Sequence, residues 1–162
     1  MSDTETTTGL ETALRSRLLT FEPLAGSPLA TVLGITESGA GSDGKLFWDA
    51  APDNIGPRWG ILRLQNRRSS GDGWEQEVAE LEITLFARPR SQKVTLELCA
   101  DLCDQAMLRF RYTDATSVVG CWGRLRSTLP PFTGPADTEV VQIRLVYSLV
   151  FWLTYLTQYH DS

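Results

Sequence analysis

The sequence predicts an α+β fold, a single domain with a mainly antiparallel mixed sheet and helices packed on one face. Segment 78–86 and the first half of segment 139–159 alternate apolar and polar residues, which is typical of strands with one buried face. Two other segments, 10–21 and 92–108, repeat apolar residues at helical spacing. The expected order is helix, helix, three strands, helix and two strands. Adjacent strands that are joined by short loops favour an antiparallel sheet.

The length of the chain sets the number of domains. A chain of 162 residues can bury one proper core and is short for two. We therefore expect one α+β domain over residues 9–159, preceded by a flexible N-terminus at residues 1–8.

The first helix begins at a capping box, in which Thr8 is followed three residues later by Glu11. Its apolar residues at helical spacing are Leu10, Ala13, Leu14, Leu18 and Phe21. Pro23 ends this helix. A second, short helix is expected at 27–33, with Pro28 at its first position.

Three strands come next. The first is Leu46–Trp48, and the second, at 59–65, has Ile61 on the face opposite Leu62 and Leu64. The polar segment 66–75 should be a hairpin loop, because its Gly-Asp-Gly triplet supplies positive-φ positions. The third strand, 78–86, has Leu81, Ile83 and Leu85 on its buried face.

The third helix is expected at 92–108, after Pro89 and with Ser91 as its cap. Its apolar face is formed by Val94, Leu98, Cys99, Leu102, Cys103 and Ala106. A strand at 117–126 leads to the final strand.

The final strand changes character along its length. Its first half places Val141, Ile143, Leu145 and Tyr147 on one face. From Leu149 onward both faces are apolar or aromatic. A strand with two apolar faces needs cover on both sides, from its own domain or from a partner chain.

Charge and hydropathy exclude some classes of protein. A net charge of −5 argues against a dedicated nucleic-acid binder, which carries a clustered basic face. The polar N-terminus lacks the apolar core of a signal peptide. The apolar run 145–156 falls short of the roughly 20 residues of a membrane-spanning helix. We expect a soluble intracellular protein with no membrane association.

Catalytic and metal-binding groups are few. The single histidine, His160, lies two residues from the C-terminus and is a poor candidate for a base. Cys99 and Cys103 could be metal ligands, but they share an apolar helix face and lack matching histidines, which favours core packing. The glycine-rich segment 39–45 lacks the order of a phosphate-binding loop. We expect no catalytic residue, no metal and no cofactor.

Two groups of residues are candidates for contacts. Arginine and aromatic residues are enriched at interfaces, and the candidates for a subunit or partner interface are Arg67, Arg68, Trp74, Arg88, Arg90, Trp152 and Tyr155. The third helix carries an acidic stripe, Glu97, Asp101 and Asp104, which is expected opposite its apolar face. An ordinary solvated helix face is one interpretation of this stripe, and the lining of a passage for an anionic molecule is the other.

The layout of the chain resembles the small tail-terminator, or tail-completion, proteins of long-tailed bacteriophages and related phage-like particles. The similarity covers residues 10–155: an amphipathic N-terminal helix, an Ala-Pro segment within Trp48–Pro52, and Pro-Arg-Trp at 57–59 before a strand. An Arg-Ser-Ser-Gly-Asp-Gly hairpin at 68–73, an alternating strand, a helix and a long terminal strand complete the pattern.

The resemblance implies a structural virion protein rather than an enzyme. Such proteins form a hexameric ring on the head-proximal end of the tail tube, stop tube polymerisation and offer a docking surface for the neck. The implied partners are other copies of the chain, the tail tube protein and a neck or head-completion protein. DNA would pass through the lumen, which the acidic stripe could line, without specific binding. The implied location is the virion, at the head–tail junction, after assembly in the cytoplasm of the bacterial host.

Two alternatives stay open. A head–tail connector or another neck protein also forms rings. A small α+β ligand-binding or enzymatic domain could instead use the aromatic final strand as a pocket wall.

Overall fold

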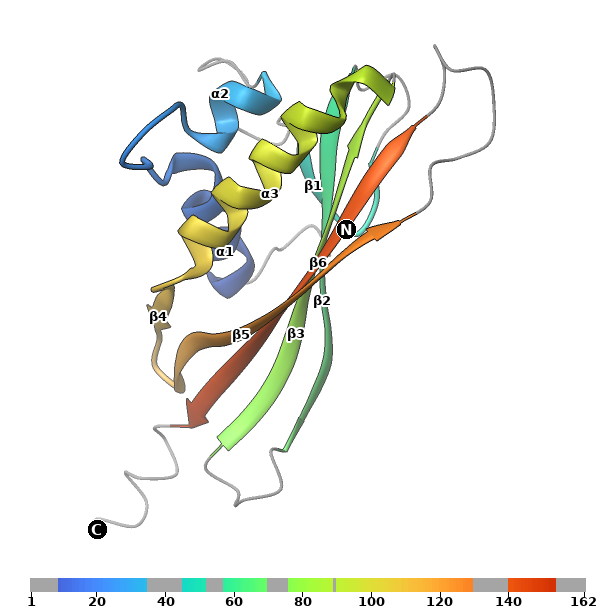
Figure 1. The fold of residues 1–162 in the computed structure, drawn as a ribbon. Helices are drawn as coiled ribbons and strands as arrows, with labels where there is room; N and C mark the ends of the chain where they lie inside the picture. The colour runs from blue at the N-terminus through green and yellow to red at the C-terminus, as the bar shows by residue number, and fades with distance from the viewer. Residues whose placement is uncertain are drawn as a thin grey trace, which may run out of the picture.

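Helices lie on one side of a twisted six-stranded sheet in the computed structural model (Figure 1). The structure describes residues 9–34, 45–51, 57–69, 76–88, 90–129 and 140–153. The elements in chain order are α1 (Gly9–Thr20), α2 (Leu29–Leu33), β1 (Leu46–Trp48), β2 (Arg58–Ser69), β3 (Gln76–Ala87), the 3-10 turn η2 (Arg90–Gln92), α3 (Lys93–Met107), β4 (Arg111–Thr113), β5 (Ser117–Leu129) and β6 (Val141–Leu153). Within the described residues, no helix has the length and apolar character needed to cross a bilayer.

The strand order is β1-β2-β3-β6-β5-β4. The first pair, β1 with β2, is parallel, and the other pairs are antiparallel. The sequence-based expectation of a single α+β domain, with a mainly antiparallel mixed sheet and helices on one face, is confirmed.

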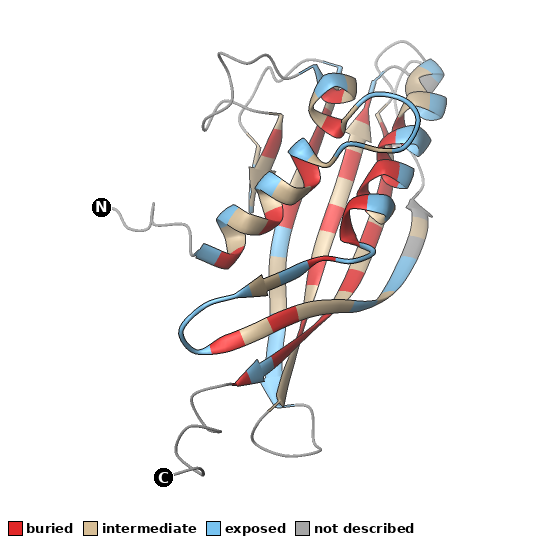
Figure 2. Ribbon diagram, turned by 90° about the vertical axis from the view of Figure 1, so that its left-hand side faces the viewer, coloured by how far each residue is buried: buried red, intermediate tan, exposed pale blue. Residues whose placement is uncertain are grey.

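The pair of β3 and β6 forms the centre of the sheet. The two strands are in register from Gln76 opposite Trp152 to Ala87 opposite Val141. Because side chains alternate across a strand, one face of this pair is buried and the other is not, as the alternating colours in Figure 2 show. The buried face consists of Ala79, Leu81, Ile83, Leu85 and Ala87 of β3 and of Val141, Ile143, Leu145, Tyr147, Leu149, Phe151 and Leu153 of β6.

The helices cover this buried face. Leu10, Leu14, Leu18 and Leu19 of α1, Leu29 and Leu33 of α2, and seven residues of α3 complete one continuous core. The seven residues of α3 are Leu96, Cys99, Ala100, Leu102, Cys103, Ala106 and Met107.

Arginines tie the helices to the rest of the domain. Arg15 Nε of α1 donates to the carbonyl oxygen of Leu46 at 2.7 Å, and Arg17 Nε donates to that of Ala106 at 2.7 Å. Burial lowers the pKa of the Arg15 guanidinium. These bonds satisfy backbone carbonyls that would otherwise lack partners at the edges of the core.

Gly60 allows β1 to approach the sheet closely. A Cβ atom at this position would stand 2.8 Å from Leu46 Cδ1 and 3.1 Å from Leu85 Cδ2. A larger residue would therefore push two core leucines apart. The close parallel pairing of β1 with β2 depends on this glycine.

The boundaries of several elements differ from the sequence-based predictions. The second strand continues to Ser69 rather than 65, through a bulge at which Asn66 has φ 59°. The short strand β4 was not expected, because three residues are too few to show a period. The third helix starts after η2, with Gln92 rather than Ser91 at its cap. The proposed capping residue Thr8, the segment 39–44 and His160 lie outside the described residues.

The last part of β6 is two-faced, as its sequence indicates. Leu149, Phe151 and Leu153 are buried on the helix side. On the other side Val150 is nearly covered, whereas Trp152 is 46% exposed. The helices therefore supply cover for one face of this segment and not for the other.

The buried side chains of β6 should dominate the stability of the domain. Leu145 is fully buried, and replacing it by alanine should lower the free energy of unfolding by about 2–5 kcal/mol, through lost burial and a residual cavity. Leu24→Ala is the matched control, because Leu24 is fully exposed and its truncation should cost less than about 0.5 kcal/mol. Urea unfolding of the two variants measures the difference, and equal losses would contradict this core.

Candidate assembly surfaces

The face of the sheet opposite the helices is covered by none of the described elements (Figure 1). We call it the open face. The strand registers determine which side chains lie next to one another in rows across this face. The first row consists of Trp59, Phe86 and Gln142, and the second consists of Ile61, Thr84, Arg144 and Ser127. The third row consists of Arg63, Glu82, Val146 and Leu125, and a further row nearer the other end consists of Arg68, Val78, Val150 and Gly120.

An ion-pair cluster occupies the middle of the open face. Glu82 accepts a bond from Arg144 Nε at 2.6 Å and lies 3.6 Å from Arg63 Nη1 on the opposite side. The Glu82 side chain is only 13% exposed, whereas both arginines are about half exposed. Two cations thus share one carboxylate, and the cluster presents excess positive charge to solvent.

An aromatic pair lies at the end of the open face near the start of β2. The rings of Trp59 and Phe86 are stacked with centroids 5.1 Å apart. The guanidinium of Arg88 lies over Trp59, 4.8 Å from the ring centroid. Stacking and the cation–π contact hold Arg88 in place at the surface.

Trp152 lies at the opposite end of the open face. Its ring lies over Gly120, where a Cβ atom would be 3.7 Å from the indole. Gly120 is the register partner of Val150, so the indole helps to cover this valine. The remaining half of the indole is exposed and available for contact.

The outer edge of β5 is only partly paired. Among the described strands β4 alone pairs with this edge, at residues 118–120. A bulge then leaves Trp122 unpaired and 74% exposed, and Leu125, opposite Val146 on the open face, is 64% exposed. Bulges and charged side chains discourage the addition of another strand, so this edge is suited to side-chain contacts.

The outer face of α3 differs from the sequence-based prediction. Val94 and Leu98 were expected in the core, but they are 76% and 47% exposed. Leu96, Ala100 and Met107 are buried in their place. The helix is apolar around more than half of its circumference, so it offers two adjacent apolar stripes. Packing against the sheet buries the stripe that contains Leu96, Ala100 and Met107 and leaves Val94 and Leu98 exposed.

The predicted acidic stripe is reduced to two residues. Glu97 and Asp101 lie on the exposed surface of α3 beside Val94 and Leu98. The prediction was wrong for Asp104, which does not belong to the stripe because its carboxylate turns toward the sheet. Asp104 Oδ1 accepts a bond from Tyr147 Oη at 2.6 Å and lies 3.2 Å from Arg124 Nε.

The Tyr147 hydroxyl explains this position of Asp104. Tyr147 is a fully buried residue of β6, and its hydroxyl needs a partner inside the domain. Burial raises the pKa of Tyr147 well above its ordinary value, and the neighbouring Cys103 and Asp104 act in the same direction. The bond joins α3 to the centre of the sheet.

The other predicted contact residues are dispersed. Arg67 points to the helix side of the sheet, where its Nε bonds Glu77 Oε1 at 2.7 Å. Arg68 is exposed and donates to the carbonyl oxygen of Asn66 at 2.9 Å. Arg90 lies in η2, and the structure does not describe its side chain. Trp74 and Tyr155 lie outside the described residues.

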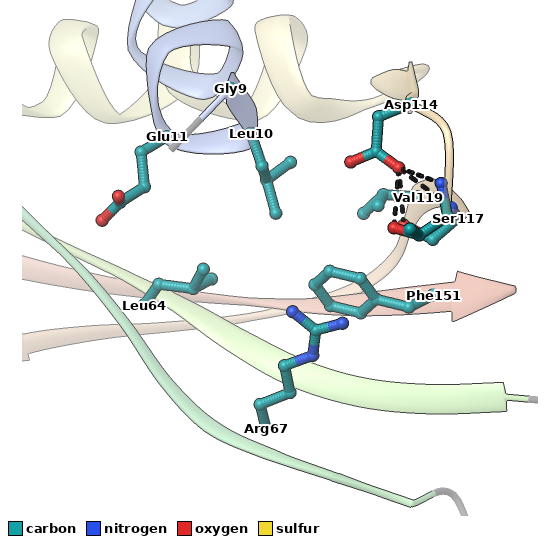
Figure 3. A pocket seen from close by; sticks show the side chains of 10 residues that line it. Gly9, Leu10, Glu11, Leu64, Arg67, Asp114, Ser117, Val119 and Phe151 are labelled. Carbon is teal, nitrogen blue, oxygen red and sulfur yellow. Dashed lines mark hydrogen bonds between the residues drawn. The ribbon is translucent and has the colours of Figure 1, made fainter. Parts of the chain in front are cut away.

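A cavity of about 360 Å³ opens beside the first turn of α1 (Figure 3). The guanidinium of Arg67 lies over the Phe151 ring at 4.3 Å on one side of it. Asp114 on the other side accepts bonds from the amides of Thr116 and Ser117, at 2.8 and 2.9 Å. These bonds lower the pKa of Asp114 and shape the β4–β5 turn. The remaining lining residues are Gly9, Leu10, Glu11, Leu64 and Val119.

The cysteines lie where core packing predicts them. Cys99 and Cys103 are buried, and burial raises the pKa of the Cys99 thiol to about 12. Among the described residues, no group of three His, Cys, Asp or Glu side chains is arranged to hold a metal ion.

Comparison of the chain with protein-family models and with curated proteins finds no match.

Alkaline pH should destabilise the domain through its buried acids. The unfolded chain ionises Cys99 from about pH 9 and Tyr147 from about pH 10, whereas the folded protein keeps both protons. The contribution of these two groups to the free energy of unfolding is therefore fully present below about pH 9. Above that pH it should fall, by up to about 1.4 kcal/mol per pH unit for each group.

Tyr147→Phe isolates one of these groups. At pH 7 it should cost about 1–2 kcal/mol through the lost bond to Asp104. Above pH 10 its stability should fall less steeply than that of the wild type, because one titrating group is gone. Urea unfolding at pH 7 to 11 measures both effects, and parallel pH profiles would contradict the role of Tyr147.

Proposed function

We propose that this protein is a structural component of a phage-like particle, where it caps the head-proximal end of the tail tube as a ring. The ring would end polymerisation of the tube and provide the docking surface for the neck of the filled head. In this role the protein is not an enzyme and uses no cofactor. Its location is the virion, at the head–tail junction.

The observation that carries the proposal is the presence of two uncovered surfaces on one protomer. The open face of the sheet exposes Leu125 and Trp152, and the outer face of α3, on the other side of the domain, exposes Val94 and Leu98. A ring is built by head-to-tail contacts, which join two different surfaces of identical subunits. A monomeric ligand-binding domain has no need of two such surfaces.

The layout of the chain supports the assignment to a tail. The elements through which the sequence resembles tail-terminator proteins occur in the same order in the fold, from α1 to β6. Pro57–Trp59 stands at the start of β2, and the polar hairpin segment joins β2 to β3. By this resemblance we expect six copies in the ring, with DNA passing through its lumen.

We assign the two ends of the sheet to the two axial partners. The register of β3 with β6 puts the ends of β2 and β3 at Ser69 and Gln76 at one end of the sheet, and the ends of β5 and β6 at Leu129 and Val141 at the other. In a ring, one end would meet the last ring of tube protein and the other would meet the neck protein.

Two other functions make different predictions. A connector or neck protein would form a ring but would not determine the length of the tail. A ligand-binding domain would be monomeric and would use the cavity beside Arg67 and Phe151. A strictly monomeric protein with a small molecule in this cavity would contradict the proposal.

Removal of the gene tests the capping role directly. Particles produced without this protein should have tails of uncontrolled, excessive length that fail to join filled heads, because nothing ends the polymerisation of the tube. Electron microscopy of lysates measures tail lengths, and expression of the wild-type chain in trans is the control that should restore normal particles. Tails of normal length without heads would instead identify a connector.

A further inference from the structure

We propose that the outer face of α3 in one copy packs against the open face of the sheet in the next copy. The contact would join Val94, Glu97 and Leu98 of one protomer to the region of Leu125, Arg144 and Trp152 of its neighbour. The inference rests on the proposed function in that it identifies the subunit contact of the ring.

The open face has the size of a stable subunit interface. Four of its strands have 12 or 13 residues. At ~3.3 Å per residue and ~4.8 Å between strands, they present roughly 800 Å². The whole open face therefore has about the area that one partner contributes to a standard stable complex, and the contact with α3 would cover part of it.

Apolar side chains are grouped at the β5–β6 side of this face. Leu125 and Val146 are register partners, and Trp152 lies over Gly120 beside Val150. Exposed tryptophan and leucine next to arginine are typical of the centres of protein interfaces. Polar side chains are also present on the same face: Ser148 lies between Val146 and Val150 on β6, and Gln142, Ser127 and Gln65 lie farther away.

The charges of the two surfaces are complementary. The chain has a net charge of −5, yet among the residues that the structure describes the open face of the paired strands carries Arg63, Arg68, Arg88, Arg111 and Arg144 beside Glu80 and Glu82. The exposed middle of α3 carries Glu97 and Asp101. Opposite charges across a contact steer association and fix its orientation.

The two surfaces lie on opposite sides of the domain and cannot meet within one protomer. The outer face of α3 points away from the sheet, and the body of α3 and the sheet lie between it and the open face (Figure 1). A contact between different surfaces is heterologous, and it closes into a ring when its rotation allows. The same contact could not produce a symmetric dimer.

Exposed apolar residues distinguish this assignment from a lumen lining. Glu97 lies beside Val94 and Leu98, and apolar side chains have no function in a passage that must not retain DNA. Burial of these residues against a neighbour would remove them from water. Glu97 is therefore assigned to the subunit contact.

Two charged substitutions test the contact by complementation. Leu98→Lys damages only the α3 surface, because it places a cation opposite the arginines of the neighbour, and Leu125→Glu damages only the open face. Both side chains already reach solvent, and Val94→Lys provides a second α3 variant at a still more exposed site. Each variant alone should be monomeric, with self-association weakened roughly 100-fold. An equimolar mixture of Leu98→Lys with Leu125→Glu should form 1:1 dimers, because one intact contact remains.

Sedimentation velocity over a range of concentrations measures the monomers, dimers and larger assemblies. The matched control is Thr31→Asp on the exposed surface of α2, which should assemble like the wild type. Wild-type-like assembly of both variants, or failure of the mixture to form dimers, would overturn the contact. A wild-type protein that stays monomeric at millimolar concentration would also overturn it. In each case tail length in gene-deletion lysates tests the capping function separately.

Charge reversal at Glu97 separates the two assignments of this residue. Glu97→Lys should weaken assembly, since it opposes arginines across the contact. Intact assembly with reduced delivery of DNA would place Glu97 in the lumen and overturn the contact. Binding of duplex DNA by the isolated wild type, abolished by Leu125→Glu while assembly is unchanged, would assign the open face to nucleic acid instead.

Discussion

The register between β3 and β6 is the constraint on which the rest of the structure depends. The two strands pair along the whole length of β3, and each alternate residue is committed to the helix side. A slip of one residue would turn every core side chain of one strand outward. The same register also determines which residues form the open face, so the core and the candidate interface are specified together.

The helix layer adds a second constraint at Tyr147. Its buried hydroxyl fixes Asp104 and thereby the rotation of α3 about its axis. With α3 in this orientation, Leu96, Cys99 and Cys103 face the sheet and Val94 and Leu98 face solvent. The apolar stripe that the rotation leaves outside is what makes the outer face of α3 a candidate contact. The internal hydrogen bond of Tyr147 and the proposed subunit contact would be linked in this way.

The sequence predicted the strands better than the helix faces. The alternation in 78–86 and 141–147 is a local pattern with period two, and both strands were found with the expected buried residues. For α3 the periodicity allowed two adjacent apolar stripes, and only packing against the sheet could choose between them. Asp104 was assigned to the wrong face because its partners, Tyr147 and Arg124, come from distant parts of the chain. Of the predicted contact residues, Arg68, Arg88 and Trp152 share the open face, whereas Arg67 faces the helix side and binds Glu77.

The central claim is that this chain assembles into a ring through two different surfaces. Electron microscopy of the purified full-length protein tests it most directly, with class averages that reveal both stoichiometry and shape. The account predicts closed rings with a central hole and six 18.0 kDa subunits related by rotation. Isolated monomers, or dimers related by a two-fold axis, would contradict it.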